Sequence, residues 1–154
     1  MSHWLIKSEP DTFSVDDLAK KPKKTTHWDG VRNFQARNFL RDQMQRGDLA
    51  FFYHSSCEVP AIAGVVKVVK PGYPDHTAFD RKDKHYDADS NPDNPRWYMV
   101  DVQLQRKLKQ PITLETLRKH ADDELRGLAL LKRGNRLSIT PVSDAHWDFI
   151  LSLE

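Results

Sequence analysis

The stretch from Asp48 to His54 constrains the fold more than any other, because it is apolar at almost every position. Successive side chains of a β-strand point to opposite faces. One face of this strand would carry Leu49, Phe51 and Tyr53, and the other Ala50, Phe52 and His54. A strand that is apolar on both faces has to be covered on both. We therefore expect it in the interior of a sheet or barrel.

The length of 154 residues is typical of one domain. A chain of this length buries roughly 70 % of the surface that its unfolded form exposes, so it can hold a core unaided. Hydrophobic residues make up 38 %, charged residues 30 % and aromatic residues 10 %, which indicates a globular rather than a disordered chain. Since no internal repeat or linker-like segment interrupts the sequence, we expect residues 1–154 to form a single domain.

Further predicted strands and helices are interspersed along the chain. Alternating or short apolar runs predict strands at His3–Ile6, Pro60–Lys70, Arg96–Arg106 and Leu137–Thr140. Capping residues and helical spacing predict helices at Ser14–Lys20, Phe34–Met44, Thr113–Ala121 and from Ser143 onward. Gly64 marks a bulge or a close backbone approach. This order predicts an α+β fold, which we expect to be a small closed barrel of mixed or antiparallel strands flanked by short helices.

Several classes of function are excluded by the residues that the chain lacks. The single cysteine, Cys57, excludes a disulfide framework and a thiolate zinc site, and it suits a reducing compartment. The seven histidines form neither an H-E-x-x-H pattern nor a zinc-deaminase signature, and no glycine-rich phosphate loop occurs. We therefore expect no metal and no cofactor. No run approaches the ~18 apolar residues of a membrane span, and no signal peptide follows Met1. We expect a cytoplasmic protein, or a nuclear one in a eukaryote.

The charge distribution allows a nucleic-acid partner without requiring one. The formal net charge is only +2, so a site for a polyanion has to be a local patch. The one basic cluster is Lys20-Lys21-Pro22-Lys23-Lys24, which is typical of a solvated turn, although such clusters also contact phosphates or act as nuclear addresses. The polar segment from Asp80 to Pro95 is too long for an ordinary loop, and we expect it to act as a lid.

Polar residues gather where predicted strands end. The clusters are Lys7-Ser8-Glu9-Pro10, the loop Trp28–Asn33 and the strand end Tyr53-His54-Ser55-Ser56. Trp97 is predicted to share a strand face with Asp101 and Gln103 rather than with the apolar residues. Aromatic faces beside short polar groups suit a planar ligand that forms hydrogen bonds. The alternative is structural: Trp28 and Trp97 would anchor the core, and His54 would be a core histidine.

The same stretches resemble the EVE-domain family. The matching segments are Trp4–Pro10, Trp28–Asn38, Gly47–Leu49, Phe52–Ser55, Tyr73–Asp75, Asn94–Trp97 and Leu137–Val142, with a departure at Thr140, where the family more often has Gln. The resemblance implies a PUA-like fold related to the YTH and ASCH domains. It also implies recognition of a modified base, either a modified cytosine in DNA or a modified base in RNA.

These observations predict a binding module rather than an enzyme. We expect the base to lie in a pocket of Trp28, Tyr53 and Trp97, with polar contacts from Ser8, Asn33, His54, Ser55 and Ser138. Lys7, Arg32 and Arg37 are expected to face the phosphates. Two alternatives stay open. One is an ASCH-like amidohydrolase that acts on an acylated nucleoside through Lys7, Ser8 or Glu9, and the other is a pocket for a small metabolite.

Overall fold

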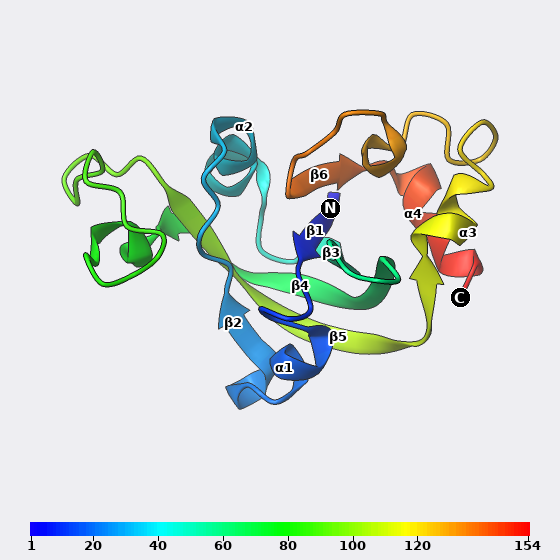
Figure 1. The fold of residues 1–154 in the computed structure, drawn as a ribbon, viewed down its shortest axis with the longest axis horizontal. Coiled ribbons are helices and arrows are strands. Elements are labelled where there is room, and N and C mark those ends of the chain that lie inside the picture. Colours follow the sequence, from blue (N-terminus) through cyan, green and yellow to red (C-terminus); the bar gives the residue numbers. More distant parts are fainter.

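A six-stranded mixed sheet forms the body of the protein (Figure 1). The computed structural model describes residues 1–154. The strands are β1 (His3–Ser8), β2 (Thr25–His27), β3 (Leu49–His54), β4 (Ala61–Pro74), β5 (Tyr98–Thr113) and β6 (Ile139–Val142). Their order in the sheet is β2-β5-β4-β3-β1-β6. Only the pairing of β1 with β3 is parallel, and the other neighbours are antiparallel. The predicted α+β class is therefore confirmed.

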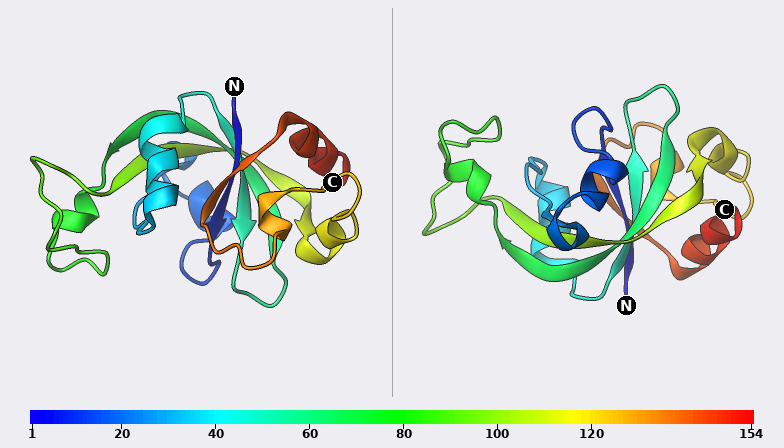
Figure 2. Two further views of the ribbon diagram at one scale, coloured as in Figure 1. Left: turned by 90° about the horizontal axis from the view of Figure 1, so that it is seen from above. Right: turned by 90° about the horizontal axis from the view of Figure 1, so that it is seen from below.

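The predicted closure into a barrel is not found. β2 and β6 are the two edge strands of the sheet, and they do not pair with each other. The sheet nevertheless bends strongly, because the β4–β5 pair contains four register shifts along its length. Figure 2 shows this long pair curving across the molecule. The result is a curved open sheet rather than a closed barrel.

β3 lies inside the sheet, between β1 and β4, as the doubly apolar pattern predicts. Its two faces contribute to two separate cores. Ala50 and Phe52 belong to one core, which also contains Trp28, whereas Phe51 and Tyr53 belong to the other. Burial of both faces holds β3 and its neighbour β1 in place, and the polar end of β1 reaches the candidate site.

The helices begin where they are predicted, but the helix after Thr113 ends at Arg118 rather than Ala121. They are α1 (Val15–Ala19), α2 (Phe34–Asn38), α3 (Leu114–Arg118) and α4 (Asp144–Ser152). α2 continues as one π-helical turn, η2 (Phe39–Gln43), and the 3₁₀ turns are η1 (Pro22–Lys24), η3 (His76–Phe79) and η4 (Ala129–Leu131). The predicted caps are confirmed, since Ser14, Thr113 and Ser143 each accept a backbone N–H from the first turn of their helix. None of these helices has the length and apolarity needed to cross a membrane.

Gly64 lies where neighbouring segments approach the backbone of β4 closely, as predicted. It lies beside a register shift in the β4–β5 pair. A Cβ at this position would come within 3.0 Å of the Val15 side chain and 3.1 Å of the Arg106 carbonyl oxygen. The absence of a side chain therefore lets α1 pack directly on the sheet.

Candidate functional site

A cavity of about 830 Å³ opens where the end of β1 meets the loop after β2. Its walls are residues 7–9, 12–13, 26–32 and 82–85, together with Ser138. Five of the predicted ligand or phosphate residues lie there: Lys7, Ser8, Trp28, Arg32 and Ser138. The structure thus brings together three of the polar segments that lie far apart in the sequence.

Trp28 is the aromatic wall of the cavity. It is 9 % exposed, and its ring meets Phe13 and Phe52 edge-on, with ring centroids 6.4 and 5.5 Å apart. Its backbone N–H donates to the Val100 carbonyl at 2.7 Å. Trp28 is therefore anchored in a core and also lines the cavity.

The end of β1 supplies the polar side chains on the floor of the cavity. Burial lowers the pKa of the Lys7 ammonium, because desolvation disfavours the charged form. The Ser8 hydroxyl donates to the Phe13 carbonyl at 2.5 Å, and the backbone N–H of Lys7 donates to the Ser138 carbonyl at 2.9 Å. These bonds fix the strand end and leave Lys7 as its cationic group.

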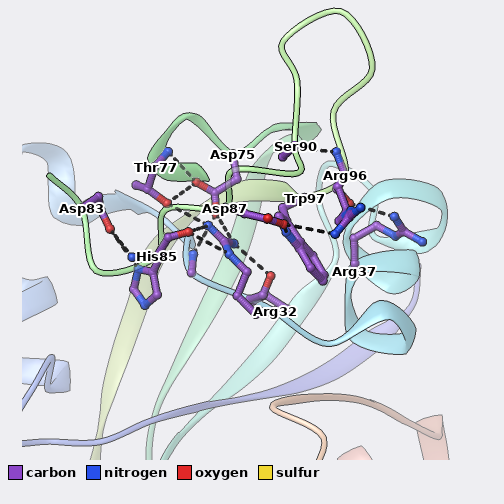
Figure 3. Close-up of polar contacts among 12 residues, drawn as sticks. Arg32, Arg37, Asp75, Thr77, Asp83, His85, Asp87, Ser90, Arg96 and Trp97 are labelled. Carbon is purple, nitrogen blue, oxygen red and sulfur yellow. Dashed lines mark hydrogen bonds and ion pairs between the residues drawn. The ribbon is translucent and has the colours of Figure 1, made fainter. Parts of the chain in front are cut away.

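Arg32 is a structural clamp, which corrects its predicted contact with phosphate. All five of its N–H donors are used within the protein (Figure 3). Nε and Nη2 donate to the His85 carbonyl at 3.1 and 2.7 Å, and Nη1 donates to the Val31 carbonyl at 3.1 Å. The remaining bonds go to Asp75 at 3.0 Å and Thr77 at 3.3 Å. Arg32 therefore fastens the segment around His85 to the cavity wall.

Asp75 is the buried partner of this clamp. One carboxylate oxygen accepts from Arg32 and from the Gly30 N–H at 2.8 Å, and the other accepts from the Thr77 N–H at 2.8 Å and hydroxyl at 2.6 Å. Burial acts to raise the pKa of Asp75, but the bonds from Thr77, Gly30 and Arg32 together outweigh it and lower the pKa below its usual value. The ionised carboxylate thus ties the loop after β2 to η3.

Gly30 is the place where the polar segment of residues 80–95 touches the cavity loop. Gly30 has a φ of +78°, and a Cβ there would come within 2.5–2.8 Å of the His85 ring. Lys82, Asp83 and Lys84 line the cavity beside His85. The long polar loop therefore borders the cavity, which is the position that a lid requires.

Trp97 does not line the cavity, which corrects its predicted role in the pocket. Only 5 % of it is exposed, and its ring stacks on Phe34 with centroids 4.8 Å apart. Its indole N–H donates to Asp87 at 2.6 Å (Figure 3). β5 begins at Tyr98, so Trp97 lies outside the strand. The alternation of side chains along β5 therefore does not place Trp97 on the same face as Asp101. It packs behind Arg32, whose Cζ lies 5.4 Å from the ring centroid.

The predicted contacts at the end of β3 also lie outside the cavity. Tyr53 is 3 % exposed and belongs to the second core. Nε2 of His54 accepts the Val15 N–H at 3.1 Å, and burial lowers the pKa of this imidazole. The backbone N–H of Ser55 donates to the Ser8 carbonyl at 2.9 Å. This strand end therefore supports β1 and α1 rather than forming a wall of the cavity.

Two predicted residues, the N-cap of α2 and Arg37 within it, form structural contacts. Asn33 is the N-cap, and its side-chain oxygen accepts the Ala36 N–H at 3.0 Å. Arg37 donates to the Arg96 carbonyl at 2.8 Å, and its Cζ lies 4.9 Å from the centroid of the exposed Phe34 ring. Neither side chain lines the cavity.

Comparison with known proteins identifies the family. The sequence profile described as "EVE domain" matches residues 2–153. The chain belongs to the EVE domain family. Human thymocyte nuclear protein 1 is 50 % identical to it, over 99 % of this chain and 74 % of that protein. The Gallus gallus protein of the same name is also 50 % identical, over 99 % of this chain and 68 % of that protein.

Solved structures of EVE relatives superpose on nearly the whole chain. Human THYN1 in complex with 5-methylcytosine-containing DNA has a TM-score of 0.95 at 49 % identity, and covers 99 % of this chain and 97 % of its own. A Pseudomonas syringae protein has a TM-score of 0.92 at 44 % identity, with 99 % of both chains covered. The fold of this EVE domain is therefore shared by human and bacterial proteins.

Sequence reasoning missed a residue that braces the cavity wall of the EVE domain and three that line the cavity. Asp75 braces the wall through Gly30 and Arg32, and an Asp two residues before Thr77 is a local signal for a side-chain turn. Phe13, His27 and His85 line the cavity itself. No local pattern marks these three residues, because segments distant in the sequence bring them together.

Proposed function

We propose that this EVE domain binds DNA that carries 5-methylcytosine, with the modified base in the cavity beside Trp28. The observation that carries the proposal is the human THYN1 structure, which was solved in complex with 5-methylcytosine-containing DNA. Its 49 % identity and TM-score of 0.95 over 99 % of this chain make a shared ligand class the simplest expectation.

The cavity has the features that an unstacked base requires. Its volume of about 830 Å³ lies within the usual range of ligand pockets. Unstacking a base costs a few kcal/mol, and stacking on an aromatic ring returns ~1–3 kcal/mol. Trp28 supplies that ring, while Lys7, Ser8 and Ser138 lie close enough to the cavity to contact the polar edge of a base.

The test is a comparison of otherwise identical oligonucleotides by fluorescence anisotropy. One duplex carries a single 5-methylcytosine and the other carries cytosine, and RNA of the same sequence is the third ligand. Burial of one methyl group is worth about 0.8 kcal/mol, so we expect at least about fourfold tighter binding of the methylated duplex. Equal affinity for both duplexes would refute the proposal, and tighter binding of the RNA would reassign the polymer.

Trp28→Leu tests the position of the base, with Trp147→Leu as its matched control. Both tryptophans are buried, but only Trp28 lines the cavity, whereas Trp147 stacks on Phe51 in the second core. We expect Trp28→Leu to abolish the preference for the methylated duplex. Trp147→Leu should lower stability and keep the preference in the folded fraction.

We also propose that the EVE domain binds without catalysing hydrolysis. The rival amidohydrolase is favoured by one observation, namely that Lys7 lies in the cavity with a lowered pKa beside Ser8 and Glu9. Against it, the Ser8 hydroxyl donates to a backbone carbonyl and the His54 ring accepts a backbone N–H, so they do not form a nucleophile–base pair.

Incubation with acylated cytidine separates the binding and hydrolytic functions. We expect no release of cytidine above the rate without protein. Multiple turnovers that disappear in Lys7→Ala would establish the hydrolase and overturn the binding-only proposal.

A further inference from the structure

Besides Lys7 at the end of β1, the cations that remain available for phosphate near the cavity are lysines on two loops. Arg32 has no free donor, as described above. Lys20, Lys21, Lys23 and Lys24 are all exposed, and none of them forms an ion pair. The same holds for Lys82 and Lys84 on the long polar loop. These six lysines are called the rim lysines below.

The first group of rim lysines adjoins the cavity through β2 and Phe13. β2 follows Lys24 directly, and its residues Thr26 and His27 line the cavity. The ammonium of Lys21 lies 6.0 Å from the ring centroid of Phe13, another residue of the cavity wall. This group therefore flanks the site next to α1.

The turn that carries these lysines has a fixed shape. The Lys23 carbonyl accepts from the Thr25 hydroxyl at 2.9 Å and from the Gln103 side chain at 3.1 Å, which ties the turn to β5. Lys23 and Lys24 have φ values of +55° and +52°, a backbone conformation that costs energy for side chains other than glycine. The bond from Gln103 that ties the turn to β5 holds the two lysines in this conformation.

The second group is held against the cavity by the Arg32 clamp. Lys82 and Lys84 line the cavity themselves and flank Asp83. The carbonyl of the next residue, His85, accepts two bonds from Arg32, and the Lys82 N–H donates to Asp80 at 2.9 Å. The two lysine groups thus come from separate segments that border one cavity.

We propose that the rim lysines bind the phosphates that flank the base in the cavity, so that the two loops grip one DNA strand. This inference rests on the proposed function. The Lys ammonium is a compact point charge that suits phosphate oxygens. A net charge of only +2 gives no general attraction to DNA, so a phosphate contact has to come from a local group of this kind.

The test compares three double variants in binding to the methylated and unmodified duplexes at 50–200 mM salt. Lys21→Gln/Lys24→Gln and Lys82→Gln/Lys84→Gln each remove two rim lysines. Lys109→Gln/Lys119→Gln removes two exposed lysines that do not line the cavity and is the matched control. Thermal unfolding of each variant verifies its fold.

Each phosphate contact contributes about 0.9 to the slope of log K against log salt. Each rim variant should therefore reduce the slope by about 1.8, which means that wild type loses about 12-fold more affinity than the variant over this range. Both duplexes should be affected alike, so that the preference for 5-methylcytosine is unchanged. The control should keep the wild-type slope.

The outcomes separate the two proposals. Wild-type slopes in both rim variants, or an equal reduction in the control, would overturn the phosphate contacts. Equal affinity of wild type for the two duplexes refutes the recognition of 5-methylcytosine, yet the slopes still decide the role of the rim lysines. Failure of wild type to bind either duplex at 50 mM salt would overturn both.

Discussion

Replacing Asp75 by Asn tests whether the buried clamp holds the cavity together. Asp75 accepts four bonds through its two carboxylate oxygens, from Gly30, Arg32 and both donors of Thr77. The amide of Asn has the same shape but only one acceptor oxygen. Its NH₂ group would face donors that the second oxygen now satisfies, and Arg32 would lose its counter-ion.

The expected cost follows from the burial of the pair. Breaking a buried ion pair by removing one partner costs ~3–5 kcal/mol. The Asp75 side chain is fully buried, but 22 % of the Arg32 side chain is exposed. We therefore expect a loss at the lower end of that range, about 3 kcal/mol. For a domain of this size the unfolding midpoint should fall by roughly 6–12 °C.

Thermal unfolding followed by circular dichroism measures this loss, with Asp42→Asn as the control. Asp42 also pairs with an arginine, Arg41, at 2.8 Å, but both side chains are well exposed, so the control should leave the midpoint unchanged within error. DNA binding by the folded fraction of Asp75→Asn should weaken as well, since the loop around His85 is released. A midpoint no lower than that of Asp42→Asn would refute the clamp.

Three further predictions concern Trp97, Lys7 and His54. Trp97→Ala should lower the free energy of unfolding by ~3–5 kcal/mol, as for a core tryptophan, while DNA binding per folded molecule stays near wild type. Chemical denaturation and DNA-binding measurements on the variant test this. Weakened binding with little loss of stability would show that Trp97 is part of the binding pocket. Lys7→Met should raise stability at neutral pH, because the lowered pKa of Lys7 means that its charge is less favourable in the folded than in the unfolded state. This gain should vanish as the pH rises to 10.5, the ordinary pKa of a lysine, because Lys7 is then losing its charge in both states. The lowered pKa of His54 means that the unfolded state binds its proton more readily, so wild type should lose stability as the pH falls below 6.5. Equilibrium unfolding of His54→Gln should lack that loss, and an identical pH profile in both proteins would contradict the assignment.

The features that the sequence predicts correctly are those set by neighbouring residues. The burial of both faces of β3 follows from its own alternation, and the caps Ser14, Thr113 and Ser143 bond within their own first turns. Barrel closure is a different kind of property. It requires β2 and β6, at opposite ends of the sheet, to pair, and no local pattern reports whether they do.

The site was predictable only in part for the same reason. The polar end of β1 and the loop that contains Trp28 are both marked by local sequence patterns, and both line the cavity. The role of Arg32 depends on Asp75, Thr77 and His85, which lie 43, 45 and 53 residues away in the sequence. Its hydrogen bonds to these residues make Arg32 a structural clamp, whereas the local sequence predicts a phosphate ligand. The pattern at Trp97 fails because the alternation of β5 begins only at Tyr98.

The indole N–H signals of the four tryptophans report most directly whether the methylated base enters the cavity. Only Trp28 lines it, whereas the indoles of Trp4 and Trp97 donate to Asp48 and Asp87, away from the cavity. In ¹H–¹⁵N spectra, with the Trp28 signal assigned by its loss in Trp28→Phe, saturation with the 5-methylcytosine duplex should shift the Trp28 signal more than the other three. The unmodified duplex should shift it less at equal saturation. An unmoved Trp28 signal at saturation with the methylated duplex would contradict the placement of the base.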